Sequence, residues 1–244
     1  MTSYQIYKAD KIVNFEQELK GDFISGVEVS ETESELAKEK INNLKNILKS
    51  PILKKSDEKE SNKYILNYSF NLRLPGEQHI WIPQEISLYK GKSNVILISK
   101  SQGNISYLIE KHLQKKSNFQ PYTFTSKQLM SFWNSFKKYF IKEGYTSVLQ
   151  RFILENAYLE SSLVKELNIK AKDAEDVGMF TDLVKSAKKF KAITLQIKWN
   201  LSDENGKRFK PMTVRIGIAG SVLIYGNHPS QLIQILINAI DSII

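Results

Sequence analysis

The sequence contains no cysteine, few histidines and no long apolar run, and each shortage excludes a class of protein. Without cysteine there is no disulfide, thiolate metal site or cysteine nucleophile, which suits a reducing compartment, so we expect a cytoplasmic protein. The first residues, MTSYQIYKADK, lack the apolar core of a secretory signal. No apolar stretch approaches the roughly 20 residues that span a bilayer, so we expect no membrane partner.

Motifs for common catalytic chemistries are absent as well. The three histidines, His79, His112 and His228, share no metal-ligand spacing. There is no glycine-rich phosphate loop, dinucleotide fingerprint or G-x-S-x-G nucleophile elbow. Clustered acids at 173–176 and 155–160 give no sign of a shared cleft, and we expect them to face solvent. The sequence therefore predicts a non-catalytic protein without cofactor or metal.

Charge is what the sequence has in excess, and it is unevenly distributed. The formal net charge is +9, from 35 lysines and arginines against 26 acids. Residues 1–35 contain three lysines and eight acids, which leaves 32 basic and 18 acidic residues in the remainder. A basic body behind an acidic leading segment suggests a polyanionic partner, although a lysine-rich composition alone would give the same balance.

Hydrophobic periodicity predicts helices and strands in alternating blocks. A helix is expected over 32–50, with capping-box spacing at Ser30 and Glu33, followed by an exposed charged linker over 54–63. Strict alternation predicts strands over 64–74 and 79–89, the latter at an edge or a bulge because of Pro83. A buried strand over 95–99 and a helix over 103–115 complete this region.

The middle of the sequence predicts a helical block, and the last quarter returns to strands. Helices are expected over 125–142, 146–168 and 178–190, the first with an aromatic face typical of core packing. Strands are expected over 192–201 and 212–218, joined by a hairpin at Asn205-Gly206, followed by the strand SVLIYG. Pro229 is expected in the first turn of an apolar final helix.

These elements predict an α+β fold. Antiparallel sheet elements form two regions with the same β-β-β-α order, 64–115 and 192–243, around a central helical block. For domains, we expect an acidic N-terminal segment with one helix and a charged linker over 1–60, and a main α+β domain over 61–244. Within that domain, 61–120 and 191–244 would hold the sheets, and 121–190 the helices.

The candidate binding site is a group of cations in the last quarter of the sequence. Lys198 and Arg215 are both out of phase with the apolar set of their strands, so they are expected on one polar face. Phosphates favour such a field through counterion release, and Phe209 or Trp81 could offer a stacking surface. The predicted nucleic-acid-binding residues are Lys188, Lys189, Lys191, Lys198, Lys207, Arg208, Lys210 and Arg215.

One short pattern supports a catalytic alternative. Gln196 and Lys198, on an otherwise apolar strand, resemble the Gln-x-Lys variant of the signature of the PD-(D/E)xK nuclease superfamily. The resemblance covers about one strand and implies a metal-dependent nuclease in which the lysine orients the attacking water. Such a site needs an acid on a neighbouring strand or turn, and the nearest upstream acids are Asp176 and Asp182.

The leading hypothesis is a non-catalytic binding protein with a basic surface that contacts DNA or RNA, within a multi-subunit assembly. The first alternative is the nuclease. The second is a protein-interaction subunit without a nucleic-acid role, which meets its partner through the acidic segment, the aromatic helix at 125–142 or the final helix. The C-terminal helix is apolar on most sides, so it is either buried or docked against a protein partner or a second copy.

Overall fold

The computed structural model describes most of the chain, which forms two compact units. The described residues are 2–29, 31, 33–56, 62–75, 78–100, 104–159, 162–170, 174, 182, 187–200, 210–226 and 230–244. Tyr7–Gln120 forms one unit, here called the N-terminal unit. Met1–Ile6 and Pro121–Ile244 together form the second, here called the C-terminal unit. The predicted domain boundary between residues 60 and 61 stays a prediction.

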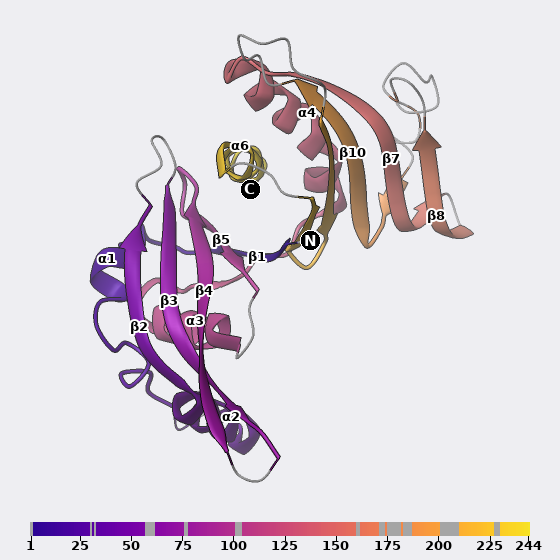
Figure 1. Ribbon diagram of the computed structural model, residues 1–244. Helices are drawn as coiled ribbons and strands as arrows, with labels where there is room; N and C mark the ends of the chain where they lie inside the picture. The colour runs from indigo at the N-terminus through magenta and orange to yellow at the C-terminus, as the bar shows by residue number, and fades with distance from the viewer. Residues whose placement is uncertain are drawn as a thin grey trace. The chain divides into compact units, whose positions relative to one another are not determined.

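The N-terminal unit places helices around an antiparallel sheet with the strand order β2-β3-β4-β5 (Figure 1). Its helices and strands are, in chain order, α1 (Phe15–Glu18), α2 (Glu35–Ile47), β2 (Leu48–Lys55), β3 (Lys63–Arg73), β4 (His79–Lys90), β5 (Val95–Ser99) and α3 (Ile105–Ser117). Two strands, β1 (Thr2–Lys8) and β6 (Gln120–Pro121), cross the division between the units.

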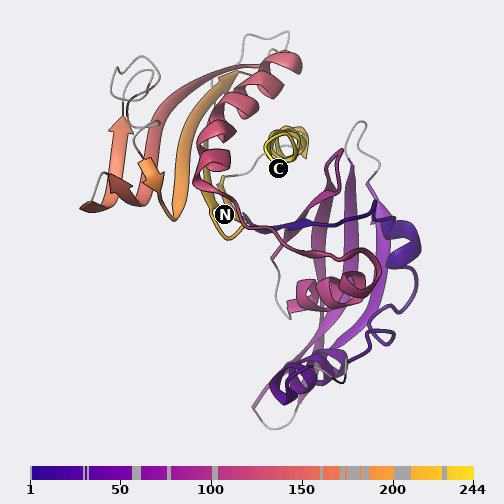
Figure 2. The ribbon, with the colours of Figure 1, turned by 180° about the vertical axis from the view of Figure 1, so that it is seen from behind.

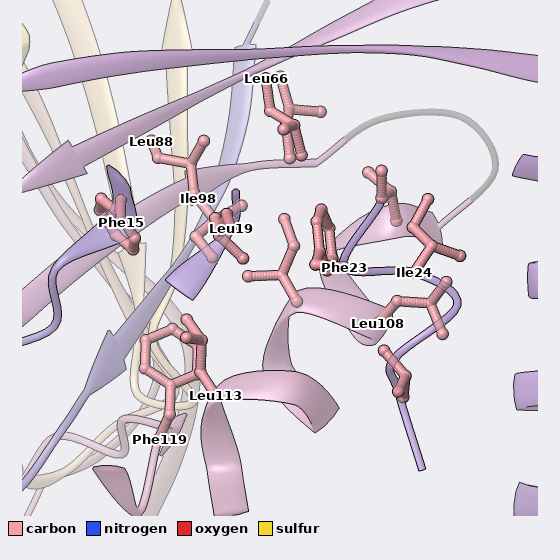
Figure 3. Close-up of a cluster of buried hydrophobic side chains, with 14 of the residues drawn as sticks. Phe15, Leu19, Phe23, Ile24, Leu66, Leu88, Ile98, Leu108, Leu113 and Phe119 are labelled. Atoms are coloured by element: carbon pink, nitrogen blue, oxygen red, sulfur yellow. The ribbon is translucent and has the colours of Figure 1, made fainter. Parts of the chain in front are cut away.

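The core of this unit gathers side chains from well-separated parts of the sequence. Leu66, Leu88 and Ile98 from three neighbouring strands belong to the same buried cluster as Leu108 and Leu113 of α3 (Figure 3). The leading segment also contributes to this core, because most of its apolar side chains are almost fully buried, among them Phe15, Leu19, Phe23, Ile24 and Val27. Residues 7–27 are therefore part of the core and not an appendage to it.

Most of the predicted elements of this unit are confirmed. Strand β3 alternates as expected, β5 is buried throughout, and α3 begins and ends within two residues of its predicted bounds. Pro83 lies where β4 pairs with β3 but not yet with β5, whose partners begin at Leu88, so the predicted edge position is confirmed. Of the predicted charged linker, 57–61 lies outside the described residues, and its ends belong to β2 and β3.

The predicted helix over 32–50 is confirmed only for Glu35–Ile47. Ser34 caps it by accepting a hydrogen bond from the Ala37 amide, whereas Ser30, the predicted cap, lies outside the described residues. Strand β2 then begins at Leu48 and includes Pro51, with a shift of register between Lys49 and Ile52. The proline therefore does not mark the end of the helix but lies in a bulge of an edge strand, where a missing amide is tolerated.

The C-terminal unit is a larger antiparallel sheet with the strand order β1-β12-β11-β10-β7-β8 and two helices. Figure 2 shows α4 running along the sheet beside β10 and β7. The elements are α4 (Ser126–Lys142), β7 (Thr146–Leu159), β8 (Ser162–Lys170), β9 (Ala187–Lys189), β10 (Ala192–Asn200), β11 (Lys210–Gly217), β12 (Ser221–Tyr225) and α6 (Ser230–Asp241).

Helix α4 forms as its sequence predicts and covers the apolar side of this sheet. Thr125 and Gln128 form a complete capping box, in which each side chain bonds the other residue's backbone amide. The aromatic stripe is buried, and it continues onto the sheet because Phe140 packs against Tyr145, which packs edge-on against Trp199 of β10. The interpretation of the stripe as core packing is confirmed.

The predicted central helical block is not shown, and its second helix is wrong. Residues 146–168, predicted as helix, form most of β7 and β8. Of the predicted third helix, residues 187–189 form β9 and Asp182 is helical, while 178–181 and 183–186 lie outside the described residues. The misleading signal comes from a bulge in β7. Gln196 pairs with Arg151, but the next residue of β10, Ile197, pairs with Leu149, so Gln150 is an extra residue. The bulge spaces buried Leu149 and Phe152 three apart, as in a helix.

What remains is an α+β protein whose sheet is mostly antiparallel. The last-quarter strands β10, β11 and β12 and the final helix α6 are confirmed, while the predicted Asn205-Gly206 turn and Pro229 lie outside the described residues. Apart from the boundaries above, the correction to the fold class is that the region expected to be a helical block, 121–190, holds the strands β7, β8 and β9 after α4.

Candidate nucleic-acid interface

Strands β8, β7, β10 and β11 present a polar face on the side of the sheet opposite the buried residues. On β10, Ile193, Leu195 and Ile197 are fully buried, while Thr194 and Gln196 are half-buried and Lys198 is exposed. Antiparallel partners point to the same side of a sheet, so the register gives the rest of the set. We call the following residues the polar face: Arg151, Ile153, Glu155, Glu166, Asn168, Lys170, Thr194, Gln196, Lys198, Thr213 and Arg215.

The predicted placement of Lys198 and Arg215 on one side of the sheet is confirmed. Thr194, two pairs along β10 from Lys198, is the Cα partner of Arg215 on β11. Both cations therefore project from the polar face. Their surroundings differ, because Lys198 is exposed and the Arg215 side chain retains only 29% of its accessible surface.

Arg215 is held by a carboxylate two strands away. Its Nε and one terminal nitrogen donate to the two carboxylate oxygens of Glu155, over 2.7 and 2.6 Å, and the Thr194 hydroxyl donates to the same carboxylate over 3.2 Å. The hydrogen bonds from Arg215 lower the pKa of Glu155, and Glu155 in turn raises the pKa of Arg215. This bidentate pair is electrically neutral, so Arg215 adds little positive potential to the face.

Two cations that the sequence analysis missed take the place of Arg215. Arg151 of β7 is the Cα partner of Gln196 on one side and of Lys170 of β8 on the other. Arg151 donates to Asn168 over 2.9 Å and lies 3.9 Å from Glu166, whereas exposed Lys170 makes no ion pair among the described residues. Both cations were missed because the sequence analysis predicted a helix in place of β7. A pattern that allowed for a bulged strand would have placed them on the polar face.

The Arg151–Lys170 pairing is unfavourable for folding alone. Like charges directly opposite each other on neighbouring strands repel and destabilise the sheet, whereas opposite charges at the same positions would stabilise it. Further along the same two strands, Glu155 and Glu166 are also partners, and each leans toward an arginine. The acids therefore offset the two arginines, and the positive excess of the polar face rests on Lys170 and Lys198.

Among the described side chains, the other predicted binding residues lie outside this face. Lys189 and Lys191 are exposed and line a separate groove near the start of α4, described below. Lys207 and Arg208 lie outside the described residues, and so do the side chains of Lys188 and Lys210, whose backbones belong to β9 and β11. The structure thus brings together two predicted cations, Lys198 and Arg215, with two that were not predicted, Arg151 and Lys170.

Of the two predicted stacking aromatics, the structure describes only Trp81, which is not part of the polar face. Phe209 lies outside them. Trp81 belongs to β4 of the N-terminal unit and is 36% exposed, with the Lys49 ammonium 4.3 Å from the centre of its ring. That lysine already makes a cation–π contact with the indole, so the ring face is not free to stack a base.

The geometry around Gln196 and Lys198 gives the nuclease alternative little support in the described part of the chain. Glu155 pairs with Ala192, six residues before Lys198, which is roughly 20 Å at about 3.3 Å per residue. Asp176 lies outside the described residues, and Asp182 is exposed. No three histidine or carboxylate side chains in the described ranges gather closely enough to hold a metal ion.

Three carboxylates of the acidic leading segment are paired with lysines of the same unit. Lysines of α3 meet its carboxylates in three ion pairs: Lys116 with Glu18 at 2.5 Å, Lys115 with Glu28 at 3.2 Å, and Lys111 with Glu33. His112, between them, bonds the Glu18 carbonyl oxygen through Nε2 over 2.8 Å, and burial lowers its pKa. The charge asymmetry of the sequence is thus partly an intramolecular match between the leading segment and α3.

The apolar side chains of α6 are buried in the chain itself. Leu232, Ile233 and Ile237 retain at most 5% of their surface, while Ile243 and Ile244 after the helix are half-buried. Contact of this helix with a protein partner or a second copy stays a prediction. Ile243 and Ile244 are the apolar side chains at this end of the chain that remain accessible for such a contact. Among the described helices, none combines the length and the apolar character needed to cross a membrane.

No family model matches the chain, and no curated protein matches it. The residues and their geometry therefore carry the functional proposal that follows.

Proposed function

We propose that this protein is a non-catalytic, nucleic-acid-associated binding protein whose polar face contacts the phosphate backbone. The observation that carries the proposal is the positive excess of that face. Among the described residues Lys170 and Lys198 make no ion pair, and they are exposed on either side of Arg151, which is itself opposite Lys170. A sheet surface with cations on three adjacent strands suits a polyanion more than a small ligand.

The like-charged pair supports the same proposal. Repulsion between Arg151 and Lys170 costs stability in the free protein. A phosphate bound between the two cations would reverse the sign of that interaction. Binding would release counterions from the nucleic acid, so affinity should fall steeply with salt and depend little on base sequence. The proposal names neither DNA nor RNA, since phosphates are common to both.

The test is a salt titration of binding to labelled single-stranded and duplex oligonucleotides, followed by fluorescence anisotropy. Reversal of two charges, Lys170→Glu with Lys198→Glu, should weaken binding at least about tenfold and reduce the slope of log K against log salt by about two. Arg215 is left intact, because its replacement would leave the Glu155 carboxylate without its partner.

A matched control keeps the same change in net charge elsewhere on the same unit. Lys138 and Lys142 are exposed on α4, away from the polar face, so Lys138→Glu with Lys142→Glu should leave affinity within about threefold. Equal weakening by both pairs would mean that net charge alone matters and would contradict an interface on the polar face. Absence of binding at low salt would remove the function altogether. Magnesium-dependent cleavage of the oligonucleotides would favour the nuclease alternative instead.

A further inference from the structure

A groove at the beginning of α4 combines an apolar floor with three lysines. It has a volume of about 770 Å³ and lies entirely within the C-terminal unit. Phe124, Phe190 and Ile218 form its floor, and exposed Leu163 of β8 extends one wall. The cations are Lys127, Lys189 and Lys191, all exposed, and the described residues that line the groove include no acid.

Backbone hydrogen bonds fix the shape of this groove. The Phe124 amide donates to the Ile218 carbonyl over 2.7 Å, the Ile218 amide donates to Lys191 over 2.8 Å, and the Lys191 amide donates to Glu155 over 2.9 Å. This chain of bonds ties the segment before α4 to the ends of β11, β10 and β7. The backbone of the lining segments is therefore fixed by the sheet, so the groove does not need a ligand in order to form.

The charge in the groove is uncompensated among the described residues. No described carboxylate makes an ion pair with any of the three ammonium groups. The positive end of the α4 dipole adds to their potential at Ser126 and Lys127, the first two residues of the helix. Concentrated positive charge beside an apolar floor favours a ligand that carries an anionic group on an apolar body.

We propose that the groove of Lys127, Lys189 and Lys191 binds a small organic anion whose apolar body lies on Phe124, Phe190 and Ile218. The volume falls within the range of about 300–1,000 Å³ typical of small-molecule sites, and the mainly apolar lining with a few converging charges is their usual composition. The site does not depend on the polar face, because the two share no residue.

The test compares two fluorescent probes that differ mainly by one acidic group. The anionic probe 8-anilinonaphthalene-1-sulfonate should bind the full-length protein at one saturable site, at least about tenfold tighter than neutral N-phenyl-1-naphthylamine. Replacing the three lysines together, Lys127→Gln, Lys189→Gln and Lys191→Gln, should remove that preference. Replacing the exposed wall residue, Leu163→Gln, should weaken both probes to a similar degree.

The control variant changes three exposed lysines that belong neither to the groove nor to the polar face: Lys92→Gln, Lys138→Gln and Lys142→Gln. It should bind the anionic probe as the unaltered protein does, and equal far-ultraviolet circular dichroism of the two triple variants would show that both are folded. Equal affinity of the two probes, or equal affinity of the two triple variants for the anionic probe, would overturn the proposal. Competitive displacement of the probe by an oligonucleotide would also overturn it, since the lysines would then belong to a nucleic-acid surface.

Discussion

Arg215 and Glu155 form a bidentate ion pair across the intervening strand β10, with nitrogen–oxygen distances of 2.7 and 2.6 Å. The pair passes over the small side chain of Ala192, the Cα partner of Glu155, and takes a third bond from Thr194. It joins β7, β10 and β11 on the polar face. Arg215, which the sequence analysis placed in the binding site, therefore has a structural role in linking these strands.

Breaking this pair should destabilise the protein. Arg215→Ala leaves a half-buried carboxylate unpaired, and we expect the free energy of unfolding to fall by about 1–3 kcal/mol. A double-mutant cycle with Glu155→Gln, measured by chemical denaturation, should give a coupling energy of similar size. The exposed pair Lys115–Glu28 is the comparison, and its coupling should stay below about 1 kcal/mol. Coupling energies of equal size would contradict a structural role for Arg215.

The same pair should make stability depend on pH in the acidic range. The pKa of Glu155 is lowered in the folded state, so the unfolded chain binds the proton more readily. The stabilisation is present above the ordinary glutamate pKa of about 4.3 and is lost as pH falls through the folded value. The unaltered protein should therefore lose more stability than Glu155→Gln between about pH 6 and pH 3. Parallel stability curves for the two proteins would show that Glu155 titrates normally.

Gly220 should be irreplaceable for two separate reasons. Its φ is +75°, and an added Cβ would lie 2.4 Å from the Tyr122 carbonyl oxygen and 2.9 Å from the Gln5 amide nitrogen. We expect Gly220→Ala to cost more than about 2 kcal/mol of unfolding free energy. Gly144 has a φ of +79° but open space around its Cβ position, so Gly144→Ala should cost about 1 kcal/mol, the backbone strain alone. Equal losses, measured by chemical denaturation, would show that the close approach to Tyr122 relaxes.

The aromatic face of α4 should dominate the stability of the C-terminal unit. Phe136 is fully buried and contacts Phe132 and Phe140, with ring centroids 5.5 and 4.6 Å away. Phe136→Ala should lower the free energy of unfolding by about 3–5 kcal/mol, measured in urea. Exposed Asn134 on the same helix provides the control, because Asn134→Ala should change stability by less than about 0.5 kcal/mol. A small effect of the first substitution would mean that the core repacks around the missing ring.

The sequence by itself determined the elements whose signals are local. Strict alternation located β3 and β10, and the Thr125 cap followed by an aromatic stripe located α4. It also placed Lys198 and Arg215 on one side of the sheet, because side-chain direction in a strand depends only on parity. These features need no knowledge of distant residues.

The tertiary structure decided what lies next to each of these residues. A single bulge at Gln150 hid β7 from the sequence pattern, and with it the placement of Arg151 and Lys170 beside the predicted face. The neutralisation of Arg215 by Glu155 and the gathering of Lys127 with Lys189 and Lys191 also join residues far apart in the chain. Cross-strand register and helix packing are long-range properties, so the neighbours that set the charge of each surface emerge only when the chain has folded.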